Sequence, residues 1–143
     1  MPSETTSTPT ASGQVGRPVI RRVLIVAGAT VAAVALWALA GPVAGVGLTV
    51  RLGGAVQPVG PGAVAGASLF AGLAAWALLA SLERVMKRPG RTWTVIAVVV
   101  LLLSLTGPLG SAVGTASTVA LSGIHLIVAA VLIPGMGRTA RGR

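Results

Sequence analysis

The chain has 143 residues, of which 54% are hydrophobic and 9% are charged. Soluble domains carry roughly 25% charged residues, so this composition excludes an ordinary water-facing globular fold. The chain has a formal net charge of +9 and no cysteine, which excludes disulfides and thiol chemistry. We therefore expect a membrane protein with few side chains from which an active site could be built.

The N-terminal segment differs from the rest of the chain. Residues 1–18 are rich in Ser, Thr, Pro and Gly and contain few apolar side chains. Such a segment buries too little apolar surface to offset the entropy of ordering. We predict a disordered tail over residues 1–18.

Four apolar stretches without Asp, Glu, Lys or Arg follow, at about residues 23–40, 63–82, 93–109 and 115–133. The first would span about 27 Å as a helix, close to a hydrocarbon core of roughly 30 Å. The third is rich in β-branched residues, but a helix satisfies its own backbone in lipid and remains the simplest choice. The predicted fold is an all-α membrane protein, with a four-helix transmembrane domain over residues 19–137 and a basic cytoplasmic tail over residues 138–143.

Basic residues flank these stretches unevenly. Three precede the first stretch, one lies in the first loop, four lie in the second loop, none lies in the third, and three follow the last stretch. If both termini are cytoplasmic, Arg51 is the one basic residue outside, as the positive-inside rule favours. We predict a multi-pass protein of the cytoplasmic (inner) membrane. Trp37 and Trp93 lie near span ends, as interfacial anchors do.

The positions of these basic residues also indicate which kinds of partner to expect. They lie in short segments beside apolar spans, without the basic face or stacking aromatic residues of a nucleic-acid-binding surface. We expect no nucleic acid partner. We expect these segments to face the lipid bilayer, with anionic lipid at its inner face.

The first stretch has a second interpretation. Arg21 and Arg22, the apolar run and Ala38-Leu39-Ala40 imitate a secretory signal peptide. The run is longer than the roughly 7 to 15 residues usual for such a core, which favours a retained helix. Cleavage after Ala40 stays the alternative.

The first loop contains a possible β-hairpin. Leu48–Leu52 and Ala55–Val59 are short runs separated by Gly53-Gly54, and a two-residue glycine turn is a hairpin signal. An isolated hairpin is marginal in water, so a flexible interfacial loop is the alternative.

Four apolar blocks carry a family resemblance. They are Val46–Val50, Ala71–Trp76, Arg91–Ile96, and His125–Ala130 with Ile133-Pro134. In this order and spacing, over about residues 20–138, the chain resembles an uncharacterised family of small four-helix actinobacterial membrane proteins, domain of unknown function 6069. The resemblance implies a fold and a membrane location. It implies no activity, substrate or catalytic residue.

His125 is the one ionisable side chain deep inside a predicted span. It lies nine residues before Pro134, about 14 Å from the inner end and so near the midplane. Thr118 and Ser122 share its helix face, because separations of four and three residues match the helical period.

Two further polar residues are expected at a similar depth. Pro108 has no N–H, so the carbonyl of Ser104 loses its helical donor, and Thr30 lies about 12 Å from the inner end of its own helix. We expect a neutral His125 that hydrogen-bonds to one of these groups, because no span offers a carboxylate. The cluster of His125, Ser122, Thr118, Ser104 and Thr30 is either a polar tie between helices or a midplane site for a solute or proton.

The second stretch carries a stripe of small residues. Ala63, Ala67, Ala71 and Ala75 recur at four-residue spacing, with Gly72 beside them. Small residues at this interval let helix backbones approach closely. We predict a close helix contact, either in an oligomer or within one bundle.

The residue types that the apolar stretches lack exclude several classes of function. No span contains the Asp or Glu that a small proton-coupled exporter needs, and zinc or carboxylate catalysis lacks its ligands and acids. We predict no catalytic residue, no metal site and no cofactor. One hypothesis is a non-enzymatic interaction or accessory protein that binds a second copy or another membrane protein. The alternative is a small transporter or channel that uses the cluster around His125.

Overall fold

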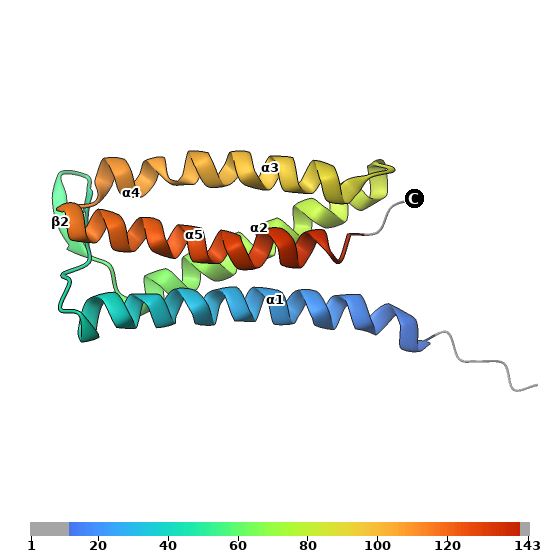
Figure 1. Ribbon diagram of the computed structural model, residues 1–143, viewed down its shortest axis with the longest axis horizontal. Helices are drawn as coiled ribbons and strands as arrows, with labels where there is room; N and C mark the ends of the chain where they lie inside the picture. The colour runs from blue at the N-terminus through green and yellow to red at the C-terminus, as the bar shows by residue number, and fades with distance from the viewer. Residues whose placement is uncertain (1–11, 141–143) are drawn as a thin grey trace, which may run out of the picture.

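The computed structural model describes residues 12–140. Its long helices are α1 (Ser12–Ala38), α2 (Pro61–Val85), α3 (Pro89–Ser104) and α5 (Thr115–Gly137). A π-helical turn, η1 (Leu39–Val43), extends α1, and the short helix α4 (Thr106–Ser111) continues α3. The helices run side by side in an elongated bundle (Figure 1).

The described residues contain four helical spans that are long and apolar enough to cross a membrane. They are Gly16–Val43, Pro61–Val85, Pro89–Ser111 and Thr115–Gly137. The predicted all-α, four-helix membrane fold is confirmed. Two spans begin earlier than predicted because Pro61 and Pro89 lie in their first turns, where a missing N–H costs nothing.

The first helix also begins earlier than predicted. Residues 12–18 belong to α1, so this part of the predicted disordered tail is helical. Once a helix is nucleated, each further residue gains a hydrogen bond while fixing only itself, and a long apolar helix can therefore extend through polar residues. The predicted tail over residues 1–11 lies outside the described residues, as do residues 141–143.

The last helix continues past its predicted end. α5 includes Pro134 and ends at Gly137. The proline removes one donor, but the amide of Arg138 donates to the carbonyl of Pro134 at 3.1 Å and closes the final turn. Thr139 and Ala140 then pack against the bundle, where Thr139 is buried. The predicted basic tail therefore begins within the fold.

Two apolar clusters form the interior. The first cluster contains Val26, Ala29, Leu79, Trp93, Leu132 and Met136. The second cluster contains Ala33, Leu48, Val64, Leu121 and Ile124. α1, α2 and α5 contribute to both clusters, whereas most apolar side chains of α3 are exposed. The centre of the bundle is therefore α1, α2 and α5, with α3 at its side.

Glycines allow the closest helix contacts. A Cβ atom on Gly72 of α2 would lie 2.6 Å from Cγ1 of Val26 on α1. A Cβ atom on Gly135 of α5 would lie 2.9 Å from Cγ2 of Ile25. Only a residue without a side chain fits these positions at this helix separation.

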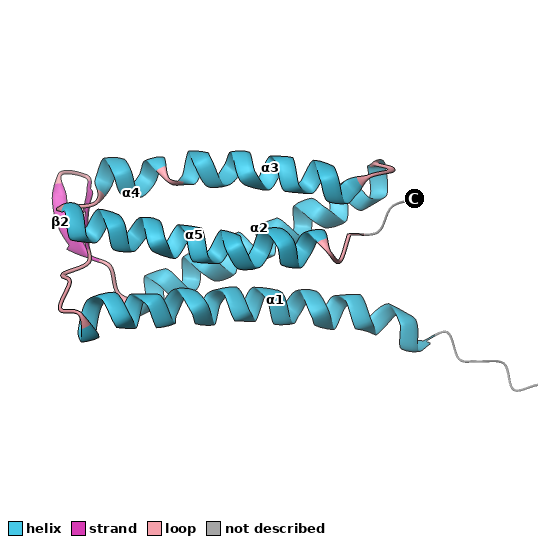
Figure 2. Ribbon diagram, in the orientation of Figure 1, coloured by secondary structure: helices cyan, strands magenta, loops and turns pink. Residues whose placement is uncertain are grey.

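The predicted hairpin is present. Strands β1 (Thr49–Leu52) and β2 (Ala55–Pro58) pair antiparallel, with Leu52 opposite Ala55, at one end of the bundle (Figure 2). Gly53 and Gly54 have φ values of 57° and 86°, and positive φ at both positions is the conformation of a type I′ turn. The glycine pair therefore sets the register of the hairpin.

The hairpin is attached to the helices rather than isolated. Ser117 of α5 donates from Oγ to the carbonyl of Gly47 at 2.9 Å, and the amide of Val113 donates to the carbonyl of Thr49 at 3.0 Å. Trp37 donates from Nε1 to the carbonyl of Val59 at 2.7 Å. These bonds tie the first loop to α1 and α5 and so remove the instability of a free two-stranded sheet.

Candidate functional site

An apolar groove of about 750 Å³ runs along the bundle between α2 and α3. The two helices meet at the turn that joins them and diverge toward the hairpin end (Figure 1). Residues of α5, including Leu121, Val128 and Leu132, line the groove between these walls. Its polar lining side chains are Ser68, Ser104, Ser111 and His125.

The small-residue stripe of α2 lines this groove. Ala63, Ala67 and Ala71 are exposed and Ala75 is half-buried. Within the described chain, these alanines therefore do not form the close packing contact that was one interpretation of the stripe. That contact lies on the neighbouring face of α2, where Gly72 meets α1. The oligomer interpretation of the stripe stays a prediction.

His125 lines the same groove from α5 and is half-buried. Its Nδ1 lies 2.8 Å from the carbonyl oxygen of Leu121, one turn earlier in the same helix. Because a carbonyl can only accept, Nδ1 carries the proton in this hydrogen bond. The predicted bond from His125 to another helix is not among the hydrogen bonds of the described residues.

Ser104 also lines the groove. Its hydroxyl donates to the carbonyl of Leu101 in its own helix at 3.0 Å. Pro108 lies in the first turn of α4, and the helix is interrupted at Leu105, as the missing proline donor favours. The structure thus places Ser104 and His125 on one groove without a hydrogen bond between them.

The other members of the predicted cluster do not line the groove. Thr30 donates to the carbonyl of Val26 at 3.0 Å, and Thr118 donates to the carbonyl of Gly114 at 3.1 Å. Both bonds stay within one helix. The Oγ atom of Ser122 is buried and has no hydrogen-bond partner among the described residues. The five residues therefore do not form one hydrogen-bonded site.

A second polar centre was missed by sequence reasoning. Arg22 of α1 donates from Nη2 to Oε1 of Glu83 at 2.6 Å. The same guanidinium donates to the hydroxyl and the carbonyl oxygen of Thr139, each at 3.1 Å. Arg22 is 7% exposed, so it is buried among protein atoms and is not a lipid-facing charge. Its position and that of Glu83, each at a terminal turn of its apolar stretch, could have indicated the pairing.

Trp93 also differs from the expectation of an interfacial anchor. Trp93 is 3% exposed within the first cluster, and its Nε1 donates to the carbonyl of Ile133 at 3.2 Å. Burial removes its large apolar ring from solvent, and the hydrogen bond satisfies its single donor. The expectation that Trp93 anchors at the bilayer interface is therefore wrong.

The comparisons with known proteins concern the family. A model described as a family of unknown function (DUF6069) matches residues 13–142. The resemblance carried by the four apolar blocks is confirmed by this match. No curated protein and no solved structure matches the chain.

Proposed function

Because the chain belongs to the DUF6069 family, which carries no known activity, we propose from its structure that it is a non-enzymatic interaction protein of the membrane. Its groove between α2 and α3 binds a transmembrane helix, namely α2 of a second copy. The observation that carries this proposal is the exposure of Ala63, Ala67 and Ala71 along the groove.

The groove and α2 offer complementary shapes. The alanines leave a hollow, and Phe70 beside them is 75% exposed. In a twofold arrangement the same surface of each copy meets the other, so Phe70 of one copy can enter the hollow of its partner. Large side chains that fill hollows lined by small residues supply the van der Waals contact that drives helix association in lipid.

The chemistry of the groove favours a membrane-embedded occupant. Its lining is apolar apart from His125 and three serines, and it contains no charged side chain to bind a soluble acidic or basic segment. Small polar groups in such a surface can add interhelical hydrogen bonds, at about 0.6 kcal/mol on average. A lipid acyl chain is the competing occupant.

The test is a pair of matched double variants. Ala67→Leu with Ala71→Leu fills the groove from α2, whereas Val95→Leu with Val99→Leu enlarges two exposed positions of α3 outside it. The masses of the full-length proteins are measured by light scattering in mild detergent, with helicity checked by circular dichroism.

We expect a dimer for the wild type and the control variant, and a folded monomer for the groove variant. A wild type that stays monomeric at every concentration would contradict the proposal and leave the groove to lipid. Equal masses for all three proteins would show that the association uses another surface.

The second candidate function is a small transporter or channel, favoured by the presence of His125 and Ser104 on one groove. Its test is pH-dependent flux in proteoliposomes. Flux above that of empty vesicles should be lost in His125→Ala and Ser104→Ala and kept in Thr118→Val, because Thr118 lies outside the groove. Wild-type vesicles without flux would reject this function.

A further inference from the structure

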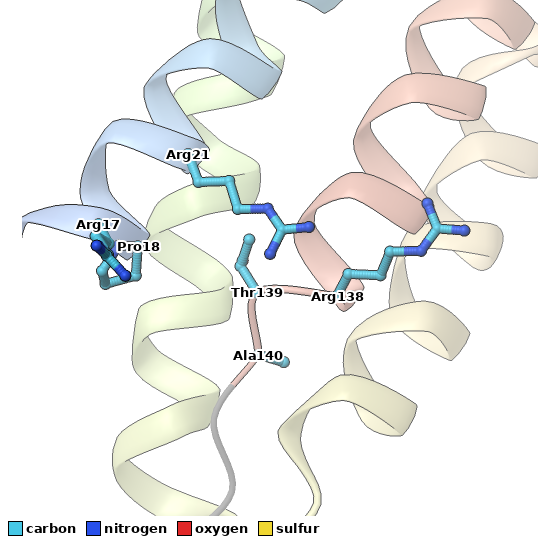
Figure 3. Close-up of a pocket in the computed structure, with 6 residues that line it drawn as sticks. All are labelled: Arg17, Pro18, Arg21, Arg138, Thr139 and Ala140. Carbon is cyan, nitrogen blue, oxygen red and sulfur yellow. The ribbon is translucent and has the colours of Figure 1, made fainter. Parts of the chain in front are cut away.

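A second, smaller pocket lies where the N-terminal part of α1 meets the end of α5 (Figure 3). It has a volume of about 240 Å³ and is lined by Arg17, Pro18, Arg21, Arg138, Thr139 and Ala140. Arg17 and Arg21 are one helical turn apart on α1, so they share a face of that helix. Three arginines from two parts of the chain therefore line one pocket.

No acidic side chain lines this pocket. The sequence has two acidic residues, and Glu83 is the one within the described residues. Glu83 accepts from Arg22, which also donates to Thr139 in the lining of the pocket. The neighbouring carboxylate is thus engaged by Arg22, and the positive charge of the three pocket arginines is available to an external anion.

Thr139, in the lining of the pocket, is held in place. Arg22 donates to both oxygen atoms of Thr139, and the hydroxyl of Thr139 donates to the carbonyl of Met136 at 2.8 Å. The position of Arg138 relative to α1 is therefore fixed by buried bonds, although its side chain is exposed. A site with a fixed backbone loses less entropy when it binds a ligand.

We propose that Arg17, Arg21 and Arg138 form a binding site for the phosphate group of an anionic phospholipid. Guanidinium groups donate two parallel hydrogen bonds to phosphate oxygens, which makes arginine well suited to this group. This site is independent of the proposed pairing of helices, because it lies outside the groove between α2 and α3 and shares no lining residue with that groove.

The surface of α1 next to the pocket favours a lipid over free phosphate. Ile20, Leu24 and Val31 lie on the same side of the helix as the two arginines, by the helical period, and are 60%, 65% and 69% exposed. From Arg21 to Val31 the helix rises about 15 Å, which is half of a hydrocarbon core of roughly 30 Å. A headgroup at the arginines would therefore place an acyl chain along this exposed stripe.

The three arginine side chains extend in different directions around the pocket. Arg21 reaches from α1 toward Thr139, whereas Arg138 extends away from Arg21 (Figure 3). Exposed side chains change rotamer in picoseconds to nanoseconds, so Arg138 can turn toward a phosphate bound at Arg21. The site therefore combines the fixed backbone at Thr139 with arginine side chains that can change rotamer.

The test uses native mass spectrometry of the full-length protein in a neutral detergent. The probes are phosphatidylglycerol, zwitterionic phosphatidylcholine and inorganic phosphate. The pocket variant combines Arg17→Gln, Arg21→Gln and Arg138→Gln. The control variant removes the same charge from the loop between α2 and α3 and the start of α3, by Lys87→Gln, Arg88→Gln and Arg91→Gln, which are exposed positions.

We expect phosphatidylglycerol to bind the wild type and the control more tightly than phosphatidylcholine does. Each removed arginine should weaken the binding about fivefold, and the pocket variant should lose on the order of 100-fold. The single variant Arg21→Gln should lose about fivefold, and it tests the site if the triple variant does not fold.

Two results would overturn the assignment. Equal loss in the pocket and control variants would show that the binding is a general effect of surface charge. Inorganic phosphate that binds alone, or that displaces phosphatidylglycerol, with the same dependence on the three arginines would keep the phosphate site and reject the lipid as its source.

Discussion

Arg22 and Glu83 join the first two helices by a salt bridge of 2.6 Å between Nη2 and Oε1, with side chains that are 8% and 18% exposed. Arg22 also holds Thr139 after the last helix. One guanidinium therefore connects α1, α2 and the segment after α5 at the end of the bundle where both described chain ends lie (Figure 1).

The first prediction concerns this ion pair. Glu83→Gln leaves the Arg22 charge buried without its counter-ion, and removing one partner of a buried pair costs about 3 to 5 kcal/mol. Because Glu83 is partly exposed, we expect a loss of about 1 to 3 kcal/mol. Unfolding in a detergent titration, followed by tryptophan fluorescence, measures it.

The control for this variant is Arg84→Gln, which removes an exposed neighbouring charge and should leave the unfolding midpoint almost unchanged. The double variant Arg22→Leu with Glu83→Leu should cost less than the sum of its single variants, because no unpaired charge remains. Additive costs would show that the two residues act independently.

The contact between α1 and α2 gives a second prediction. A methyl group on Gly72 would lie 2.6 Å and 3.0 Å from the two Cγ atoms of Val26. Gly72→Ala should therefore destabilise the protein by about 1 to 3 kcal/mol through overpacking. Gly66→Ala is the matched control, because a methyl group there meets no atom within 4 Å.

The same detergent titration measures both glycine variants. The double variant Gly72→Ala with Val26→Ala should cost less than the sum of its single variants, because the smaller side chain at position 26 makes room for the methyl group. If Gly72→Ala were as stable as Gly66→Ala, the helices would not approach as closely as described.

A third prediction concerns the attachment of the hairpin. Ser117 is 3% exposed; its hydroxyl donates to the carbonyl of Gly47 and accepts from the amide of Thr49 at 3.4 Å. Ser117→Ala leaves both backbone groups without this partner, at a cost of about 1 to 3 kcal/mol. Hydrogen exchange over residues 46–59 should become faster.

Thr118→Val serves as the control, because the hydroxyl of Thr118 bonds within its own helix. Its loop exchange should match that of the wild type. Unaltered exchange in Ser117→Ala would mean that the loop is held by Trp37 and the other bonds alone.

The fourth prediction is the orientation in the membrane. Ten of the eleven basic residues would be cytoplasmic if both termini and the loop between α2 and α3 are inside, as the positive-inside rule favours. The chain has no cysteine, so single cysteines at Gln57 and Met86 report the side. An impermeant thiol reagent should label only position 57 in intact cells. Labelling of position 86 instead would show that the protein has the opposite orientation.

The intact mass of the same preparation tests the retention of α1. We expect residues 1–40 to be present, because α1 supplies Val26, Ala29 and Ala33 to the two clusters. A mature chain that begins at Gly41 would support the signal-peptide alternative.

Features with local causes could be predicted from the sequence. The hairpin follows from a glycine pair whose positive φ values set its turn, and the four spans follow from the length of apolar stretches. The predicted helix ends were less accurate. Pro18 and Pro134 remain inside helices, because tertiary packing and helix extension stabilise those helices.

Features that depend on distant partners could not be predicted. The pairing of Arg22 with Glu83 and Thr139 joins residues separated by 61 and 117 positions. The four-residue spacing of the α2 stripe gave its common face but not what that face meets, and Gly72 on the neighbouring face makes the contact with α1. His125 and Ser104 share a groove, yet each polar group bonds within its own helix.

Cysteine crosslinking tests most directly whether α2 pairs with α2 of a second copy across the groove. Single cysteines are placed at Ala71, inside the groove, and at Leu69, an exposed position outside it, in native membranes under mild oxidation. A disulfide requires Cα atoms within about 7 Å of each other. We expect a disulfide-linked dimer for Ala71→Cys and none for Leu69→Cys. A chain that stays monomeric with cysteine at position 71, or links equally well from both positions, would contradict this pairing.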